Sequence, residues 1–585
     1  MSLFRNLLIN KKRKPYYCEV EYLESTGTQY IDTGIVAKSG IKSVLNFEYT
    51  SITGTASMLD ARSDNNRFYL CHVGKPSNTF YFYFGYGSAT QSSTVPTVNT
   101  RYLVETDLSI GSQSMKVNGI SIATGSSSTS YNLGVNLYLF GMNYNTPQYL
   151  AFAKLYCCKI TDGSTLVRDF IPVLDWNYVP CMYDKVSGQL FYNAGTGSFT
   201  YGREIHYVDY IESTGTQFID TGIKLTNDHS VELDYQLTQA SQSRAGLYGN
   251  LATARYGTLL SPSNQYLEFG YGTSNLWYQM GLPDTNRHVI KQAKNNIYMD
   301  GSLLTSFTYS TFSIANTAPL GSFGYTNYTP AKAKYYGSKW WYNDDLIRDY
   351  KPAIDENGVA FWFDRVSHSI YDNAGTDVFK YPAKETEYIA NAGTPAYIDL
   401  GAKYKSTMSI RGKFTRDDQG ASGSVLLVTN TTTAPLIYFP ALNANSKQDR
   451  YVWRRSGYSE QSYYLSFANY PFTQEVVLDA VNDTLTVNGT LVKSGMIAGM
   501  GGYTSPYSSS SNMYMFSITG SYAGNGKIYY LKIDDGSTPV FDLIPAYKDS
   551  KAGVYNKIDG TFYANASTNA NAALTAGKIV ESEWF

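Results

Sequence analysis

The residues of this chain best placed for catalysis are two carboxylates in VELDYQL, the segment from Val231 to Leu237. Glu232 and Asp234 alternate with apolar residues, and a carboxylate pair is what a glycoside hydrolase uses as acid and base. The next position of the same row is Gln236, an amide that cannot act as a general acid. A solvent-facing row at period 2 explains the segment better, so we predict no catalytic residue and no enzyme.

Cysteine and histidine give no pattern typical of a metal site. Neither residue type keeps the spacing of zinc ligands. The adjacent Cys157 and Cys158 would point to opposite faces of a strand and are poorly placed to bridge each other. The odd count of five cysteines favours free thiols and folding in a reducing cytoplasm.

The acidic segments Asp162-Gly163 and Asp534-Asp535-Gly536 would fit either calcium sites or ordinary β-turns, and we favour ordinary turns. We expect neither a metal nor a cofactor.

The strongest binding candidates are aromatic. In TFYFYFGYG, from Thr79 to Gly87, strand alternation directs Phe82 and Phe84 to a core and Tyr81 and Tyr83 outward. Tyrosine and tryptophan bury a large area at low entropic cost and stack on sugar rings. A central core strand or a subunit interface would give the same pattern. The candidates for glycan binding or an interface are Tyr81, Tyr83, Tyr86, Tyr266, Tyr271, Trp453 and Arg454.

These stretches belong to a long internal repeat. VEYLESTGTQYIDTGI (Val20 to Ile35) returns as VDYIESTGTQFIDTGI (Val208 to Ile223) and, more divergent, as TEYIANAGTPAYIDLG (Thr386 to Gly401). Solenoid repeats span roughly 20–50 residues, whereas this spacing is the size of a domain. The chain therefore contains three tandem copies of one fold.

Each copy reads as strands and tight turns. Asn118-Gly119, Asp300-Gly301 and Asn488-Gly489 each separate alternating apolar residues, which is the strongest short signal for a β-hairpin. Short strands with regular turn signals predict a sandwich or jelly roll. A helical period is expected only in the N-terminal arm and in the alanine-rich stretch Ala566 to Ala576.

The repeat sets the expected domains: an N-terminal docking arm (1–19), jelly rolls at 20–203 and 204–384, and a third at 385–585 that includes a C-terminal tail. The linkers, Tyr201 to Tyr207 and Tyr381 to Glu385, are short and lack a Gly/Ser tether, so neighbouring domains should abut semi-rigidly. The arm lacks the residue order of a signal peptide. Its docking candidates are Leu3, Phe4, Leu7 and Leu8.

Composition excludes two classes of partner. The 585 residues are 43% hydrophobic but only 16% charged, with a formal net charge of −1. Domains that bind nucleic acid are usually strongly basic, so none is expected here. No run of 18 apolar residues exists, so no membrane insertion is predicted.

The opening YLESTGTQYIDTGI, the VNG hairpin and the late IRDYKPAID with YDNAGTD resemble concanavalin A-like, laminin-G-like jelly rolls of gut bacteria and their phages. The resemblance runs from about Val20 to about Ala573. It implies an all-β protein: three tandem β-sandwich jelly rolls with a short N-terminal arm. Some enzymes of this superfold are β-glucanases, which Gln236 disfavours.

The resemblance also implies a function. Similar proteins are commonly phage tail or head fibres, receptor-binding or decoration proteins, or bacterial surface proteins that bind glycans. The expected role is therefore a non-enzymatic virion protein, assembled in the host cytoplasm. Its expected partners are other virion proteins through the arm, host cell-surface polysaccharide and further copies of itself, a trimer being one arrangement. A bacterial carbohydrate-binding surface protein is the alternative, and a glycoside hydrolase the least favoured.

Overall fold

The computed structural model describes residues 14–581, except for 65, 76–78, 88–89, 253, 262–265, 274–276, 282, 326–327, 406, 417–426, 430–435, 444–447, 455–460, 467–471, 483, 495–507 and 517–523. The chain divides into two compact units. The first unit comprises 1–356, 360–379 and 581–585, and the second comprises 357–359 and 380–580. The first two sequence copies thus lie in one unit and the third in the other.

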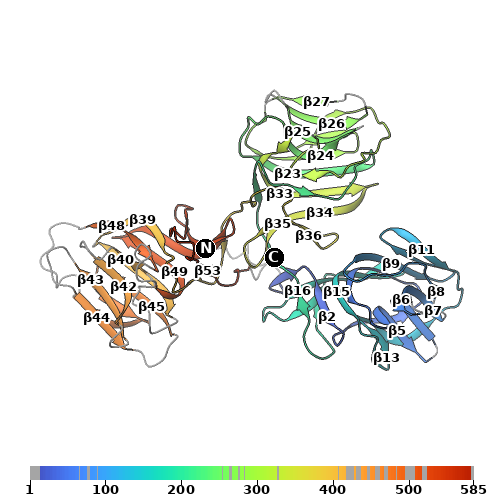
Figure 1. The fold of residues 1–585 in the computed structure, drawn as a ribbon, viewed down its shortest axis with the longest axis horizontal. Coiled ribbons are helices and arrows are strands. Elements are labelled where there is room, and N and C mark those ends of the chain that lie inside the picture. The colour runs from blue at the N-terminus through green and yellow to red at the C-terminus, as the bar shows by residue number, and fades with distance from the viewer. Residues whose placement is uncertain are drawn as a thin grey trace, which may run out of the picture. The chain divides into compact units, whose positions relative to one another are not determined.

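Every regular element of the described residues is a β-strand (Figure 1). The all-β prediction is therefore confirmed, but the expected helix at Ala566 to Ala576 is wrong. Polar side chains in this stretch bond to nearby backbone instead: Ser567 accepts from the amide of Asn569, and Asn569 accepts from the amide of Asn571. Such local bonds compete with helix formation.

The first sandwich packs two sheets around one core, in which Phe47 and Leu155 of one sheet meet Leu59 and Phe82 of the other. The first sheet contains β2 (Leu23–Thr26), β4 (Ile41–Ser51), β9 (Arg101–Ser109), β10 (Ser112–Val117), β11 (Ile120–Gly125), β15 (Phe152–Asp162), β16 (Thr165–Leu174), β17 (Pro180–Asp184), β18 (Gln189–Phe191) and β19 (Thr200–Tyr201). The second contains β3 (Ile31–Lys38), β5 (Ala56–Ser63), β6 (Asn66–Gly74), β7 (Tyr81–Gly87), β8 (Thr90–Gln91), β12 (Asn132–Leu139), β13 (Met142–Tyr144) and β14 (Thr146–Gln148).

The second sandwich repeats this plan, and Tyr248 and Trp340 meet edge-on between its sheets. One sheet holds β20 (Glu204–Tyr207), β21 (Ile211–Thr214), β23 (His229–Leu237), β28 (Arg287–Ala293), β29 (Asn296–Met299), β30 (Ser302–Ser306), β33 (Lys332–Tyr342), β34 (Asp345–Ile354), β35 (Ala360–Asp364) and β36 (Ser369–Tyr371). The other holds β22 (Ile219–Asp220), β24 (Ala245–Leu251), β25 (Arg255–Leu260), β26 (Leu267–Gly272), β27 (Trp277–Met280), β31 (Pro319–Leu320) and β32 (Thr329–Pro330).

The second unit is a third sandwich, with a core that joins Ile410 and Phe414 to Met513 and Met515. Its larger sheet contains β37 (Lys384–Glu385), β38 (Ile389–Ala392), β40 (Met408–Arg416), β45 (Phe472–Asp479), β46 (Thr484–Val487), β47 (Thr490–Ser494), β49 (Asn525–Asp535), β50 (Thr538–Lys548), β51 (Lys551–Asn556), β52 (Phe562–Ala564) and β53 (Thr575–Ala576). Its smaller sheet contains β39 (Ile398–Lys405), β41 (Leu427–Val428), β42 (Leu436–Asn443), β43 (Gln448–Arg454), β44 (Gln461–Ser466) and β48 (Ser508–Met515).

The repeated opening phrase has a structural cause. The side-chain oxygen of Gln29 accepts the amide of Thr26 at 2.8 Å, while its side-chain nitrogen donates to the carbonyl of Ser198 at 3.1 Å. Gln217 repeats both bonds, to Thr214 and Val378. Each glutamine is almost fully buried and ties the start of its copy to the end, so the amide satisfies backbone groups that a buried turn would otherwise leave unpaired.

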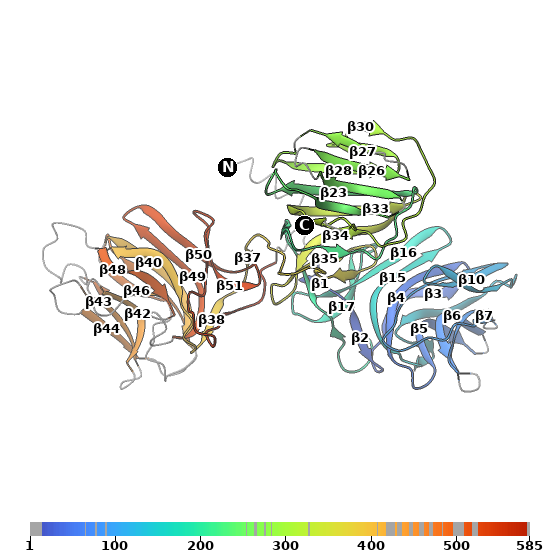
Figure 2. The ribbon, with the colours of Figure 1, turned by 45° about the horizontal axis from the view of Figure 1, so that its top comes forward.

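The two sandwiches of the first unit are joined strand to strand. The short strand β1 (Cys18–Val20) pairs antiparallel with β16 on one side and with β20 on the other. Strand β20 in turn pairs with β34, so one continuous sheet of 21 described strands runs through both sandwiches. Figure 2 labels β1 near β34 and β35 of the second sandwich. We call the β1–β20 pairing the seam.

Candidate functional site

The seam is formed by the last residues of the expected arm and by the expected first linker. Tyr16, Tyr17 and Cys18 are buried in the first unit, and Trp176 donates its indole N–H to the carbonyl of Lys14 at 2.9 Å. The described part of the arm is therefore built into the sandwich pair. Leu3, Phe4, Leu7 and Leu8 lie outside the described residues.

A cavity of about 810 Å³ opens beside the seam, and we call it the seam cavity. Buried rings line it, and those of Tyr16 and Tyr183 lie 5.0 Å apart. Its lining residues are Lys14, Tyr16, Glu19, Lys159, Tyr183, Lys185, Tyr207, Leu346, Asp349, Arg365, Val366 and Glu581. Both sandwiches contribute to it, so neither would form the cavity alone.

Only some of the charged side chains that line the seam cavity form ion pairs among the described residues. Arg365 Nε donates to Asp349 at 3.0 Å, and Lys14 lies 3.9 Å from Glu581. Lys159 and Lys185 are exposed and form no ion pair with any residue that the structure describes. The cavity thus combines aromatic rings with two lysines that are open to an acidic ligand.

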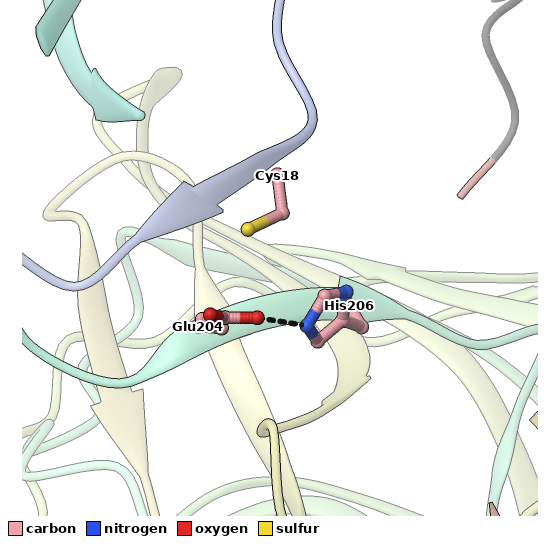
Figure 3. A group of neighbouring side chains, drawn as sticks. All are labelled: Cys18, Glu204 and His206. Carbon is pink, nitrogen blue, oxygen red and sulfur yellow. Dashed lines mark hydrogen bonds and ion pairs between the residues drawn. The ribbon is translucent and has the colours of Figure 1, made fainter. Parts of the chain in front are cut away.

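A second group of polar side chains lies within the seam. Among the described residues, only Cys18, Glu204 and His206 have the donor types and spacing to hold a metal, with ligand atoms within 4.8 Å of one another. His206 Nε2 is 2.8 Å from Glu204 and its Nδ1 is 2.9 Å from Glu581. We call these four residues the seam cluster; Figure 3 shows the first three converging.

The surroundings of the seam cluster act on its acid–base groups in known directions. Burial raises the pKa of the Cys18 thiol well above its ordinary value, and the charge of Glu204 raises it further. Burial alone would lower the pKa of His206, but the hydrogen bonds to Glu204 and Glu581 outweigh it and raise that pKa. Without a metal, these surroundings therefore favour the neutral form of the Cys18 thiol and the cationic form of His206.

Strand β7 has the alternation that the sequence predicts. Phe82 and Phe84 are fully buried, whereas Tyr81 and Tyr83 on the opposite face are half-buried. Tyr86 shares the inward face, where its hydroxyl donates to the carbonyl of Ser127 at 3.1 Å. Tyr86 is therefore a core residue and is not available to a ligand on the outer face.

Tyr266 and Tyr271 differ in exposure. Tyr266 is half-buried next to β26, while Tyr271 is fully buried and stacks on Phe307 at 5.8 Å. Tyr271 is inaccessible because the strand alternates and places it inward. Trp453 and Arg454 belong to β43, but their side chains lie outside the described residues.

The carboxylates of VELDYQL are engaged across neighbouring strands. Asp234 accepts two bonds from Arg287, at 2.8 and 2.7 Å. Glu232 pairs with Lys291 at 3.4 Å. Gln236 accepts from Tyr336 at 2.8 Å. This is the solvent-facing row that the period predicts, with cross-strand pairs instead of a free acid and base.

One buried constellation has the residue types of a catalytic triad without its geometry. Both Ser57 Oγ and Asp60 Oδ2 lie 2.8 Å from the same nitrogen of His72, Nδ1. A triad needs the nucleophile on one ring nitrogen and the carboxylate on the other. The arrangement therefore does not activate Ser57.

The contacts of the acidic turns at Asp162 and Asp535 fit ordinary β-turns better than calcium sites. Asp162 pairs with Lys38 at 2.7 Å, and Asp535 pairs with Lys405 at the same distance. A lysine in this position already supplies the positive charge that calcium would bring. The repeated Asp32, Asp220 and Asp399 each accept the backbone amide of the glycine two residues later.

The sequence patterns predicted neither the seam cavity nor the seam cluster. Glu204 and His206 lie in the segment interpreted as a linker, and Cys18 lies in the expected arm. Their one local signal is the polar pair Glu204-x-His206, which places two donors on one strand face. The proximity of Glu204 and His206 to Cys18 depends on the pairing of two strands that are far apart in the sequence.

No family model matches the chain, and no curated protein matches it. Solved structures similar to it include the LG1-3 region of the laminin α2 chain, with 11% identity and a TM-score of 0.27 over 93% of this chain and all of the other. Mouse laminin α1 domains LG4-5 show 10% identity and a TM-score of 0.22, covering 57% of this chain and 92% of theirs. Trypanosoma rangeli sialidase with the inhibitor DANA shows 9% identity and a TM-score of 0.19, covering 82% of this chain and 92% of the other.

These superpositions are too loose to assign a function. The sheets themselves define the class of protein: an all-β chain of tandem two-sheet sandwiches. No helix among the described residues is long and apolar enough to span a membrane.

Proposed function

We propose that this chain is a non-enzymatic phage virion protein, a tail or head fibre or a decoration protein, whose sandwiches bind host-surface glycans. We further propose that the seam cavity is a glycan site. The observation that carries the proposal is the cavity of about 810 Å³ in which tyrosine rings meet charged side chains. Ligand sites are typically concave, with rings for contact and a few polar groups for orientation.

The lining favours an acidic sugar over a neutral one. The exposed Lys159 and Lys185 offer ammonium groups to a carboxylate or sulfate, while the almost fully buried rings of Tyr16 and Tyr183 form part of the cavity wall. Hydrogen bonds between ionised partners are roughly twice as strong as neutral ones. We therefore expect a glycan that contains uronic acid, sialic acid or sulfate.

The virion role rests on the repeated sandwiches and on the resemblance of the opening phrase. Tandem copies and self-association would multiply weak sites into useful avidity. The residues before Lys14 would dock on another virion protein, with Leu3, Phe4, Leu7 and Leu8 as apolar anchors. Further copies of the chain are proposed partners, a trimer being one arrangement, since the same avidity argument favours several chains on one particle.

The alternative function is a bacterial carbohydrate-binding surface protein. It uses the same seam cavity and differs only in where the chain is displayed. A glycoside hydrolase is disfavoured because Glu232 and Asp234 are both paired with basic residues.

A glycan array followed by titration tests the binding site. We expect acidic glycans to bind, and the double variant Lys159→Gln/Lys185→Gln to weaken binding by about tenfold or more, since 1.4 kcal/mol corresponds to a factor of ten. Lys224→Gln removes an exposed lysine of the same unit outside the cavity and should leave binding unchanged. Unaltered binding by the double variant would exclude the cavity; Tyr81→Ala/Tyr83→Ala would then test the outer face of β7.

Immunogold electron microscopy of purified phage, with antibody against this chain, tests the display. Gold on fibres or the tail tip supports an adhesin, and gold on the capsid supports decoration. Absence of gold from every particle would overturn the virion role and favour the bacterial surface protein.

A further inference from the structure

The seam cluster has the composition and arrangement of a metal site. Cys18, Glu204 and His206 supply a sulfur, a carboxylate oxygen and an imidazole nitrogen within 4.8 Å of one another (Figure 3). All three residues are buried, Cys18 completely. Zinc is bound in proteins by these donor types, and a tetrahedral Zn²⁺ binds sulfur at about 2.3 Å and nitrogen or oxygen at about 2.0–2.2 Å.

The register of the seam explains why the three donors meet. In the antiparallel pair, Glu19 lies opposite Ile205 and Val20 opposite Glu204. Continuing this register by one residue places Cys18 opposite His206. Since side chains two apart share a face, Cys18 joins Glu204 and His206 on one side of the seam. The convergence is therefore fixed by the backbone of two paired strands.

A fourth residue completes the arrangement from behind. Glu581 Oε1 lies 2.9 Å from His206 Nδ1, on the far side of the ring from Glu204. Histidines that bind metals through one nitrogen almost always donate the other N–H to a carboxylate or carbonyl, which fixes the tautomer. Glu581 thus leaves Nε2 as the metal-binding atom and directs it toward Glu204 and Cys18.

We propose that Cys18, Glu204 and His206 bind one Zn²⁺ ion, with Glu581 as the carboxylate that orients His206. A thiol with an imidazole selects zinc over calcium or magnesium, which prefer oxygen ligands. Zinc binding requires the Cys18 thiolate and an unprotonated His206 Nε2, so any proton that these two atoms carry is released to solvent. The two anionic ligands then neutralise the 2+ charge of the ion, which suits a buried site.

The site has an entry path and a structural consequence. Glu581 lines the seam cavity as well as the seam cluster, so an ion can arrive from solvent through the cavity. Cys18 lies in β1 and the other two ligands lie in β20, so the bound ion would cross-link the two strands that join the sandwiches. The ion would thereby hold β1 and β20 together, and one water molecule would complete its tetrahedral coordination.

Metal content and a cobalt spectrum test the proposal on the full chain. After treatment with a chelator and addition of Zn²⁺, elemental analysis should give one zinc per chain. Co²⁺, used as a spectroscopic probe, should give a thiolate-to-cobalt charge-transfer band that disappears in Cys18→Ser. Cys181→Ser removes another buried free thiol of the same unit, outside the cluster, and should retain the band.

A second variant isolates the orienting carboxylate. Glu581→Gln should weaken zinc binding by about 10–100-fold, the usual cost of losing such a partner, while it keeps all three ligands. The wild-type stoichiometry does not depend on whether any variant folds. Absence of stoichiometric zinc in the wild type, or a cobalt band that persists without Cys18, would overturn the proposal and leave an ionic Glu204–His206–Glu581 cluster.

Discussion

At the scale of single residues, the histidines of the first unit differ in protonation because different groups face them. His229 is buried, and its Nδ1 accepts the amide N–H of Thr226 at 3.0 Å. Burial lowers its pKa to about 4, despite the neighbouring Asp228. His288 is partly exposed; burial alone would lower its pKa, but hydrogen bonds to Asp300 and Asp284 outweigh this and raise it. The same side chain is thus held neutral in one place and favoured as a cation in another.

His229 should make the first unit less stable in mild acid. Its pKa is about 4 when folded and about 6.5 when unfolded, so the unfolded chain binds more protons between these values. The free energy of unfolding should therefore fall as the pH drops from about 6.5 toward about 4, with no further contribution below that. Between pH 7 and pH 5 we expect a loss of about 1–2 kcal/mol from this group.

Urea unfolding at the two pH values measures this effect. His229→Asn keeps an acceptor for the amide of Thr226 but does not titrate, so the variant should lose less stability on acidification than the wild type. Equal losses in the two proteins would show that His229 does not control the acid sensitivity.

The exposure of individual side chains was the property least predictable from the sequence. Alternation correctly separated Phe82 and Phe84 from Tyr81 and Tyr83, because β7 is a regular strand with one face on the core. Tyr86 was misassigned because a tyrosine can be buried when its hydroxyl finds a partner, here the carbonyl of Ser127. The same composition serves a core and a binding face, so residue type alone did not separate them.

At the scale of elements, the hairpins show why short turn signals can be trusted. Asn118, Asp300 and Asn488 have φ of 51°, 50° and 50°, each followed by a glycine at positive φ. Their side-chain oxygens accept the backbone amides of Leu103, Val289 and Glu475, all at 2.8–2.9 Å. The turn residues therefore fix both the hairpin and its attachment to the preceding strand.

Gly119→Ala should destabilise the first unit by about 1–2 kcal/mol. Its φ is +78°, and a Cβ would meet no atom within 4 Å, so the cost is backbone strain alone. Gly54→Ala is the matched control, because its Cβ would also meet nothing but its φ lies outside the left-handed region. In thermal unfolding, Gly119→Ala should lower the Tm more than Gly54→Ala does. Equal Tm values for the two variants would contradict the strain argument.

Local elements were predictable because their signals lie within a few residues. The seam was not, since β1 and β20 are separated by the whole first copy and their pairing reflects neither periodicity nor turn chemistry. The sequence indicated short linkers and abutting domains. It could not indicate that Cys18 would lie opposite His206, which depends on a register between distant strands.

At the scale of the whole molecule, the continuous sheet predicts how the chain unfolds. The first two sandwiches share the 21-stranded sheet and one compact unit, while the third forms a unit with its own core. We expect two transitions in differential scanning calorimetry, because elements joined through a packed sheet unfold together. Three transitions of similar enthalpy would show that the seam does not couple the first two sandwiches.

The seam also limits how such a protein can be rearranged by recombination. Exchanging the first copy alone, with breakpoints at the ends of the sequence repeat, would cut β1 at Val20 and replace β16, the strand that pairs with β1 on the side away from β20. The β1–β20 pairing would lose this support, and a strand edge left unpaired is prone to intermolecular pairing. A viable chimera must carry the segment from Lys14 through both sandwiches to Phe379, together with Glu581, which belongs to the same unit. The inherited module is then a pair of copies, even though the repeat in the sequence is a single copy.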